Sequence, residues 1–329
     1  MAPGGTACHC CLISMDQPPR TLTYRKPNVF AQMWRHRTLM LMFLPGFAFI
    51  LLFNYGPIYG VQIAFKDFNI SKGIWGSPWV GLKHFVSFFT VPDNLRLLKN
   101  TVIISVLKLV FSFPAPIVLA IMINEIGGRV FKRTVQTISY LPHFISWVII
   151  AGLVTAVLSP STGVVNIIMK ALGGRSIYFM TNSTSFRPIL VISNIWKEIG
   201  WSSVIYLAAL SGVDPQLYEA AMIDGSSRMQ RVWHITIPSI LSVVAIILIL
   251  SMANILNAGF DQVFNMYNPS VYGVSDIIDT YVYRVGLGQM QFSFTTAMGL
   301  FKSLVGLLMV VIVNAATAGL GQSEYGLFH

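Results

Sequence analysis

The sequence is short of charge. Of its 329 residues only 10% are Asp, Glu, Lys or Arg, whereas 54% are hydrophobic and the mean hydropathy is +0.67. A soluble globular domain carries about 25% charged residues, so this composition excludes an ordinary soluble protein and indicates an integral membrane protein. The excess of 22 basic over 12 acidic residues therefore points to the flanks of membrane spans and to anionic lipid, and not to nucleic acid.

Cysteine is nearly absent. The three cysteines are Cys8, Cys10 and Cys11, which form one clump with His9 in a Gly- and Pro-rich tail. A zinc site normally draws its ligands from two separate groups. The clump therefore favours a tail without a metal, and it provides no disulfide framework.

The common signatures of enzymes are absent as well. The sequence has no GxxxxGK[ST] phosphate loop, no HExxH zinc motif and no GxSxG elbow. The six histidines are scattered, and no set of nucleophile, base and orienting group stands out. We expect no catalytic residue, metal ligand or cofactor in this chain. A membrane enzyme whose residues converge from separate spans remains an alternative.

Long apolar runs dominate the chain. Six of them reach the roughly 20 residues that a membrane-spanning helix needs, and they lie at about 38–58, 101–123, 138–158, 188–210, 239–258 and 295–316. We predict an all-α integral membrane protein with an N-terminal tail 1–37, one six-span domain 38–320 and a C-terminal tail 321–329. Basic residues before the first run and at 129–133 favour both termini inside the cell.

A patterned polar segment, 214–238, separates the fourth and fifth runs, and it contains EAAMIDGSSRMQRVWHITIP from Glu219 onward. Asp214-Pro215 is typical of a helix start, and Gly225 can take the left-handed conformation that ends a helix. Two adjacent alanines leave room for another surface to approach. The pattern predicts a short helix across the membrane face, joined to a span on each side. It is either an ordinary interfacial helix or one that a partner grips.

This segment resembles the EAA loop of binding-protein-dependent ABC importers, with Ile237 in place of the usual leucine of the closing I-x-L-P. Two longer stretches, NIWKEIGWSSVIYLAALSGVDPQLYEAAMIDG at 194–225 and GIWGSPWVGLKHF at 73–85, resemble carbohydrate-importer permeases related to the maltose system. Within these, the similarity is greatest to the subgroup for aldouronate or polysaccharide uptake. The resemblance covers nearly everything after residue 37.

The resemblance implies the type I ABC importer permease fold and a place in a bacterial cytoplasmic membrane. It implies one half of an oligosaccharide pore, shared with a second, different permease subunit. Two cytoplasmic ATPase subunits would bind ATP and Mg²⁺, and an extracytoplasmic solute-binding protein would deliver the sugar. The residues expected to contact the ATPase through a coupling helix are Glu219, Ala220, Ala221, Asp224, Gly225 and Arg228. An importer of a peptide, amino acid or polyamine, or a scaffold for another soluble protein, remains an alternative.

Polar groups inside spans are costly, which makes them candidates for the substrate pathway. The candidates are Asn194, Lys197, Glu198 and Trp201 in the fourth run, and Asn254, Asn257 and Asp261, spaced three and four apart on one expected helix face, in the fifth. Each group could instead join helices by an ion pair or by hydrogen bonds. Lys108 and Lys302 also lie in apolar runs, where they could snorkel, pair with acids or meet a uronate-containing sugar.

Overall fold

The computed structural model describes residues 36–319. Within that range every regular element is a helix, apart from one isolated antiparallel bridge between Lys66 and Trp79. The predicted all-α class is therefore confirmed. The cysteine clump and most of both predicted tails lie outside the described residues. The contacts within the chain divide it after Tyr59 into two units.

The first unit holds one apolar helical span. It consists of α2 (Arg37–Ile50), the π-helical turn η1 (Leu51–Tyr55) and the start of the 3₁₀ helix η2 (Gly56–Phe65). No side chain of α2 is buried. A helix that is apolar on all sides without a protein partner is suited to lipid, and its position matches the first expected run.

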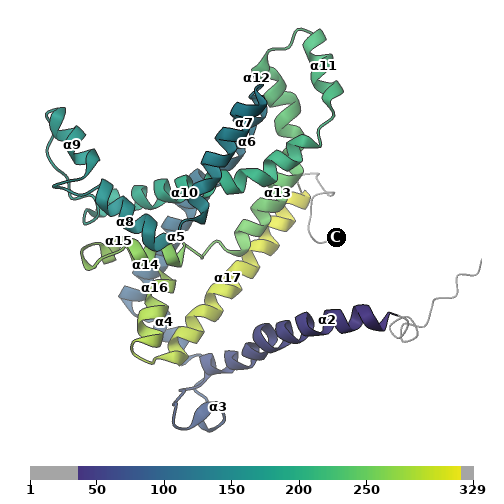
Figure 1. Ribbon diagram of the computed structural model, residues 1–329. Coiled ribbons are helices and arrows are strands. Elements are labelled where there is room, and N and C mark those ends of the chain that lie inside the picture. Colours follow the sequence, from purple (N-terminus) through teal and green to yellow (C-terminus); the bar gives the residue numbers. More distant parts are fainter. Residues whose placement is uncertain (1–35, 320–329) are drawn as a thin grey trace, which may run out of the picture. The chain divides into compact units, whose positions relative to one another are not determined.

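The second unit contains the remaining helices, and Figure 1 labels its α-helices along the chain. They are α3 (Gly73–Gly76), α4 (Lys83–Thr90), α5 (Pro92–Ser112), α6 (Pro114–Glu125), α7 (Arg129–Tyr140), η3 (Leu141–Phe144), α8 (Trp147–Val157), α9 (Val164–Ala171), α10 (Ser183–Ser211), α11 (Pro215–Ile223), α12 (Arg228–Arg231), η4 (Val232–Thr236), α13 (Ile237–Ala253), α14 (Phe260–Met266), η5 (Pro269–Val271), α15 (Tyr272–Ser275), α16 (Ile278–Val282), η6 (Tyr283–Leu287) and α17 (Phe292–Gly319).

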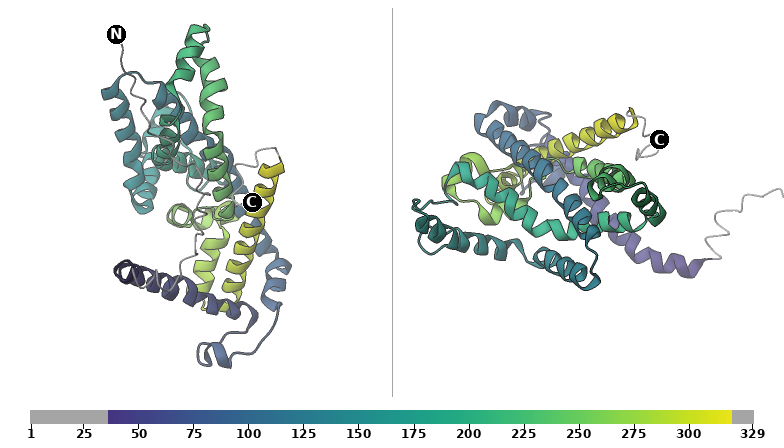
Figure 2. Two further views of the ribbon diagram at one scale, coloured as in Figure 1. Left: turned by 90° about the vertical axis from the view of Figure 1, so that its right-hand side faces the viewer. Right: turned by 90° about the horizontal axis from the view of Figure 1, so that it is seen from above.

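Helix α10 runs through the middle of this unit and joins two of its apolar cores. Phe186 and Leu190 near its start are fully buried in a cluster with residues of α5, α8 and α14. Tyr206 and Leu210 near its end pack with Ala120 of α6 and with α13. A third cluster joins α4, α5, α16 and α17. The polar segment with α11 and α12 lies at one end of the unit, and α4 and α16 lie at the other (Figures 1 and 2).

The predicted count of six spans is not confirmed. Among the described residues, four helices are long and apolar enough to cross a membrane, at 37–65, 92–125, 228–253 and 292–316. The third expected run, 138–158, is not one straight helix. It is broken at 145–146, where the two halves bend by 102°, and the pair would make a fifth span. Helix α10 covers the fourth expected run. It is not among the four apolar helices, because its middle contains polar residues.

The fifth expected run, 239–258, is wrong at both ends. The helix begins at Arg228 and passes without a break through α12, η4 and α13. In η4 the backbone N–H of Ile237 donates to the carbonyl of Val232, a π-helical bond that accommodates the missing N–H of Pro238. The helix ends at Ala253, so the last five residues of the expected run are not helical.

Candidate functional site

The polar segment folds as the sequence predicted at its start. Helix α11 begins at Pro215, and the side chain of Asp214 accepts a hydrogen bond of 2.9 Å from the backbone N–H of Gln216. Gly225 follows its last turn with φ +78°, and the N–H of Ser226 donates to the carbonyl of Ala221 at 2.9 Å. Both ends of this nine-residue helix are therefore satisfied locally, without a neighbouring helix.

The turn after Gly225 connects α11 firmly to the next span. Ser227 and Gln230 form a reciprocal capping box at the start of α12. The hydroxyl groups of Tyr218 and Thr236 lie 3.1 Å apart and link α11 to the base of α13. This contact joins α11 to α13, and the short connection at 212–214 joins α11 to α10.

The outer surface of α11 has no partner among the described residues. None of its side chains is buried, and Leu217, Met222 and Ile223 are exposed to 51%, 53% and 87%. Glu219, Asp224 and Arg228 are exposed, and no other described side chain or backbone group bonds to their side chains. A Cβ added at Gly225 would meet nothing within 4 Å. Five of the six residues predicted to contact an ATPase are therefore exposed, and Ala221 is half-buried. The exposed surface combines apolar and charged groups.

Lys197 and Glu198 of α10 lie beside the break between η3 and α8. The Lys197 ammonium donates to the carbonyls of His143 at 2.5 Å and Ile145 at 2.7 Å. Glu198 Oε2 lies 2.8 Å from His143 Nδ1. Since the break frees backbone carbonyls from helical bonding, these contacts supply the missing donors. The geometry favours the helix-joining alternative for Lys197, which is only 6% exposed.

Trp201 and Asn194 occupy the same helix but have freer surroundings. The Trp201 ring stacks on the His143 ring with centroids 4.8 Å apart, and the tryptophan is 48% exposed. Asn194 is partly exposed and makes no side-chain hydrogen bond to another described residue. These two residues keep the capacity to stack on a sugar or bond to its hydroxyls.

Asn254, Asn257 and Asp261 do not share a helix face, so that prediction is wrong. Helix α13 ends before Asn254, and Gly259, with φ +88°, begins the separate helix α14. All three polar residues are exposed. Asn254 and Asn257 lie in a stretch of non-helical backbone, and Asp261 lies in the first turn of the helix that follows it. At membrane depth, non-helical backbone occurs where protein or a water-filled cavity surrounds it.

Lys108 of α5 fixes this interruption. Its ammonium donates to the carbonyl of Ala258 at 2.7 Å and to Oε1 of Gln262 at 2.5 Å. The Gln262 amide in turn donates to the carbonyl of Leu190 and to the hydroxyl of Ser193 on α10. A single chain of hydrogen bonds, partly buried at Lys108 and buried at Gln262, therefore connects the α13–α14 break to two other helices.

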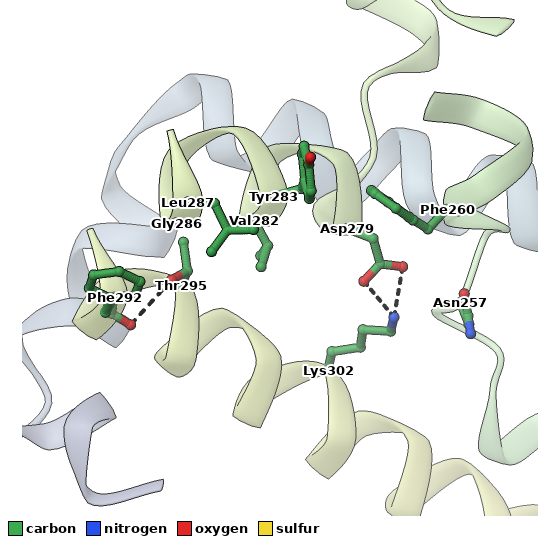
Figure 3. A pocket seen from close by; sticks show the side chains of 10 residues that line it. All are labelled: Asn257, Phe260, Asp279, Val282, Tyr283, Gly286, Leu287, Phe292, Thr295 and Lys302. Carbon is green, nitrogen blue, oxygen red and sulfur yellow. Dashed lines mark hydrogen bonds and ion pairs between the residues drawn. The ribbon is translucent and has the colours of Figure 1, made fainter. Parts of the chain in front are cut away.

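A cavity of about 430 Å³ opens beside the same break, between α14, α16, η6 and α17 (Figure 3). Asn257 and Phe260 reach it from the break, and Tyr283 from η6. Lys302 of α17 donates to both carboxylate oxygens of Asp279, at 2.6 and 2.8 Å. Of these five, only Asn257 was among the predicted pathway residues. Lys302 was recognisable as a charge in an apolar run, but nothing in the sequence indicated its partner.

Arg284 next to this cavity is held in place. Its guanidinium donates to Asp276 at 2.6 Å and lies over the rings of Tyr272 and Tyr281. Burial alone lowers the pKa of Arg284, but the hydrogen bond and the negative charge of Asp276 outweigh it, so the pKa is raised above its ordinary value. This arginine stays charged and paired.

The described residues contain no group of three or more His, Cys, Asp or Glu side chains that could hold a metal ion. The clump of Cys8, His9, Cys10 and Cys11 lies outside the described residues.

Comparison with known proteins places these features in a family. Residues 112–322 match the family of binding-protein-dependent transport system inner membrane components. The chain is 45% identical over 298 residues to the polygalacturonan/rhamnogalacturonan transport system permease protein YteP of Bacillus subtilis (strain 168), covering 91% of this chain and 93% of that protein. It is 27% identical over 280 residues to the maltose/maltodextrin permease protein MalF of Escherichia coli (strain K12), covering 77% and 54% of the two chains.

Two solved structures share the fold. The crystal structure of a bacterial ABC transporter for import of the acidic polysaccharide alginate matches with a TM-score of 0.82 at 42% identity, covering 88% of this chain and 98% of the other. A complex of such a transporter with an alginate pentasaccharide-bound periplasmic protein matches with a TM-score of 0.83 at 41% identity, covering 89% and 98%. The chain therefore belongs to the binding-protein-dependent transport system inner membrane components: it is a permease subunit of an ABC importer, and ATP hydrolysis takes place on a separate subunit.

Proposed function

We propose that this permease imports a uronate-containing oligosaccharide and that α11 is the helix through which an ATPase subunit drives it. One observation carries the coupling role. Helix α11 is capped at both ends by its own residues, is bonded to the next span through Tyr218 and Thr236 at 3.1 Å, and presents an outer surface without a partner among the described residues. A partner that seats on α11 can therefore move α10 and α13 together.

Different residues on the surface of α11 have different roles in docking. Leu217, Met222 and Ile223 provide apolar area, and Ala220 and Gly225 let a partner approach the backbone closely. Glu219, Asp224 and Arg228 provide charges that fix the orientation of the contact, because charged groups at the rim of an interface select the partner more than they strengthen binding.

The proposed assembly has two permease subunits, of which this chain is one and a different chain is the other. Two ATPase subunits bind ATP and Mg²⁺ on the cytoplasmic side, where α11 and both termini lie. A solute-binding protein delivers the sugar from outside, and lipid covers the outward apolar faces. In this assembly the chain itself needs no cofactor. The family match and the complex with a periplasmic protein among its relatives support this arrangement.

The substrate class rests on the relatives. One is named for polygalacturonan and rhamnogalacturonan transport, and the two solved structures are of alginate transporters. Polygalacturonan and alginate are built from uronic acids, so the shared chemistry is a chain of pyranose rings with carboxylates. On the pathway, Asn194, Trp201, Asn254, Asn257 and Asp261 would meet these rings. Lys197 and Glu198 would hold the η3–α8 break open beside them.

The experiment that tests the coupling role is a pull-down from native membranes in a gentle detergent, with bound proteins identified by mass spectrometry. The wild type should bring down an ATPase with a phosphate loop and a second permease. Gly225→Asp should stay in the membrane, keep the second permease and lose the ATPase. The matched control is Gly173→Asp, because Gly173 also has a positive φ, +83°, and open space around an added Cβ.

Transport is measured in parallel. Glu219→Lys and Gly225→Asp should both abolish uptake of oligogalacturonate without lowering the amount of permease in the membrane. Uptake that survives both changes would remove the coupling role from α11. If the wild type brings down no ATPase while other membrane complexes remain intact, the α11 surface serves a different soluble partner.

A further inference from the structure

Lys302 is the single charged residue of α17, a helix of 28 residues that is otherwise uncharged and mostly apolar. A charge inside a span is costly in lipid, so such residues face protein or a water-filled cavity. The Lys302 and Asp279 side chains are 22% and 21% exposed. The pair is therefore neither sealed in the core nor fully in solvent, and it opens onto the cavity drawn in Figure 3.

The broken backbone at 254–259 faces the same cavity. Asn257 lies in the break, and Phe260 is the first residue of the helix that follows it. Non-helical backbone beside a span lines cavities in transporters, because its free amide groups need polar neighbours or water. Two independent features, a lone span charge and an interrupted helix, thus indicate that this cavity is not a lipid contact.

The chemistry of the lining fits a sugar. The rings of Phe260 and Tyr283 lie 5.5 Å apart at 48°, and Tyr283 is 44% exposed. These rings offer an apolar surface for the face of a pyranose. Asn257 can donate to and accept from hydroxyls, Lys302 donates and Asp279 accepts. A cavity with aromatic walls and a few convergent polar groups is the usual form of a small-molecule site.

We propose that this cavity is a subsite for one unit of the oligosaccharide, in which Tyr283 and Phe260 stack on the ring and Lys302 exchanges Asp279 for the uronate carboxylate. The inference rests on the substrate class proposed above. Asp279 keeps Lys302 paired while the site is free of sugar, and it competes with the substrate when sugar is present. That competition keeps binding weak, which a transport pathway needs because each unit must also leave.

The first test is protection from labelling in the assembled transporter, with both permeases, the ATPases and the binding protein. Cys8, Cys10 and Cys11 are replaced by Ser, and Leu287→Cys supplies the only thiol of this chain, at an exposed residue that lines the cavity and takes no part in the proposed stacking. Both arms contain a non-hydrolysable ATP analogue, so the conformation is held, and trigalacturonate is present in one. An anionic thiosulfonate reagent should label the cysteine in the sugar-free arm. The cysteine should react about two- to fivefold more slowly in the arm with sugar bound.

Two labelling results would overturn the inference. Equal rates with and without trigalacturonate, in a variant that still transports it, would show that sugar does not enter the cavity. No labelling in either arm would show that the other permease or lipid covers it.

The second test is specificity. Uptake of oligogalacturonate is compared with uptake of its methyl ester, which removes the charge and adds only a methyl group to each carboxylate. Lys302→Gln should lower the acid-to-ester ratio about two- to fivefold, and Asp279→Asn should raise it. The binding protein contributes equally in each variant, so its preference cancels. Lys83→Gln is the matched control, since it removes a lysine from the exposed pair with Asp67.

An unchanged ratio in Lys302→Gln with uptake preserved would remove the role of Lys302. If Lys302→Gln fails to assemble, the labelling of Leu287→Cys still decides whether sugar enters the cavity. A wild type that imports neither acid nor ester would overturn the proposed substrate class itself, and the subsite with it.

Discussion

The ammonium group of Lys197 donates to the carbonyl oxygen of Ile145 at 2.7 Å, across the point where the helical run of 129–157 bends by 102°. Ile145 lies between two helices, so neither of them supplies a donor for its carbonyl. Because a shielded carbonyl without a donor is costly, this contact stabilises the bend.

Replacing Lys197 by Met should therefore destabilise the protein. Loss of hydrogen bonds to a charged donor costs about 1.5–3 kcal/mol. Glu198→Gln should cost less, since Glu198 is about a third exposed and can still bond to His143. Thermal unfolding in detergent measures both. A Lys197→Met variant that keeps its unfolding temperature but loses transport would instead favour a direct contact of Lys197 with the substrate.

Gly200 offers a second test of how α10 packs. A Cβ at Gly200 would collide with the main chain of Ser139 and Tyr140 in α7. Gly200→Ala should thus destabilise by about 1–3 kcal/mol through overpacking. Gly299 in α17 has nothing within 4 Å of an added Cβ, so Gly299→Ala should be neutral or stabilise by about 0.5–1 kcal/mol. Equal unfolding temperatures for the two variants would contradict the close approach of α7 and α10.

Local signals in the sequence were sufficient where the structure is local. Asp214, Pro215 and Gly225 predicted both ends of α11, because caps and left-handed turns depend on neighbouring residues. The bend at 145–146 also has local signals. Pro142 lies at the start of η3, the short helix that precedes the bend, and Ser146 caps α8, which follows it. The apolar character of 138–158 concealed them, since hydropathy does not register a change in direction.

The parts that the sequence could not predict depend on distant residues. The break that follows α13 is bonded by Lys108, which is 150 residues away from its acceptor Ala258. Asp279 and Lys302 come from different helices, and each alone resembles an ordinary loop acid or a snorkelling lysine. Hydrophobic periodicity locates spans, but it does not indicate which distant polar groups meet inside them.

Substitution of Gly259 tests whether the Lys108 contact holds the break between α13 and α14. It has φ +88°, and an added Cβ would lie 2.6 Å from the Lys108 ammonium. Gly259→Ala must therefore bear backbone strain of about 1–2 kcal/mol and also displace the lysine. Gly81 has φ +59° with open space around it, so Gly81→Ala bears the strain alone. We expect Gly259→Ala to lower the unfolding temperature more than Gly81→Ala. A smaller effect at Gly259 would show that the lysine contact does not hold the break.

Two substitutions of Gly225 distinguish its role in the turn from its proposed role in the contact with an ATPase. Asn takes the left-handed conformation more readily than Ala does, so a position that only forms a turn should tolerate Gly225→Asn better than Gly225→Ala. A partner seated against the glycine would be displaced by either side chain. Since nothing in the described chain lies within 4 Å of an added Cβ there, we expect both variants to lose bound ATPase to a similar extent while their unfolding temperatures differ. Quantitative mass spectrometry of the purified complexes measures the bound fraction. Full retention of the ATPase by Gly225→Asn would restrict this glycine to the turn and place the docking contact on Leu217, Met222 and Ile223 instead.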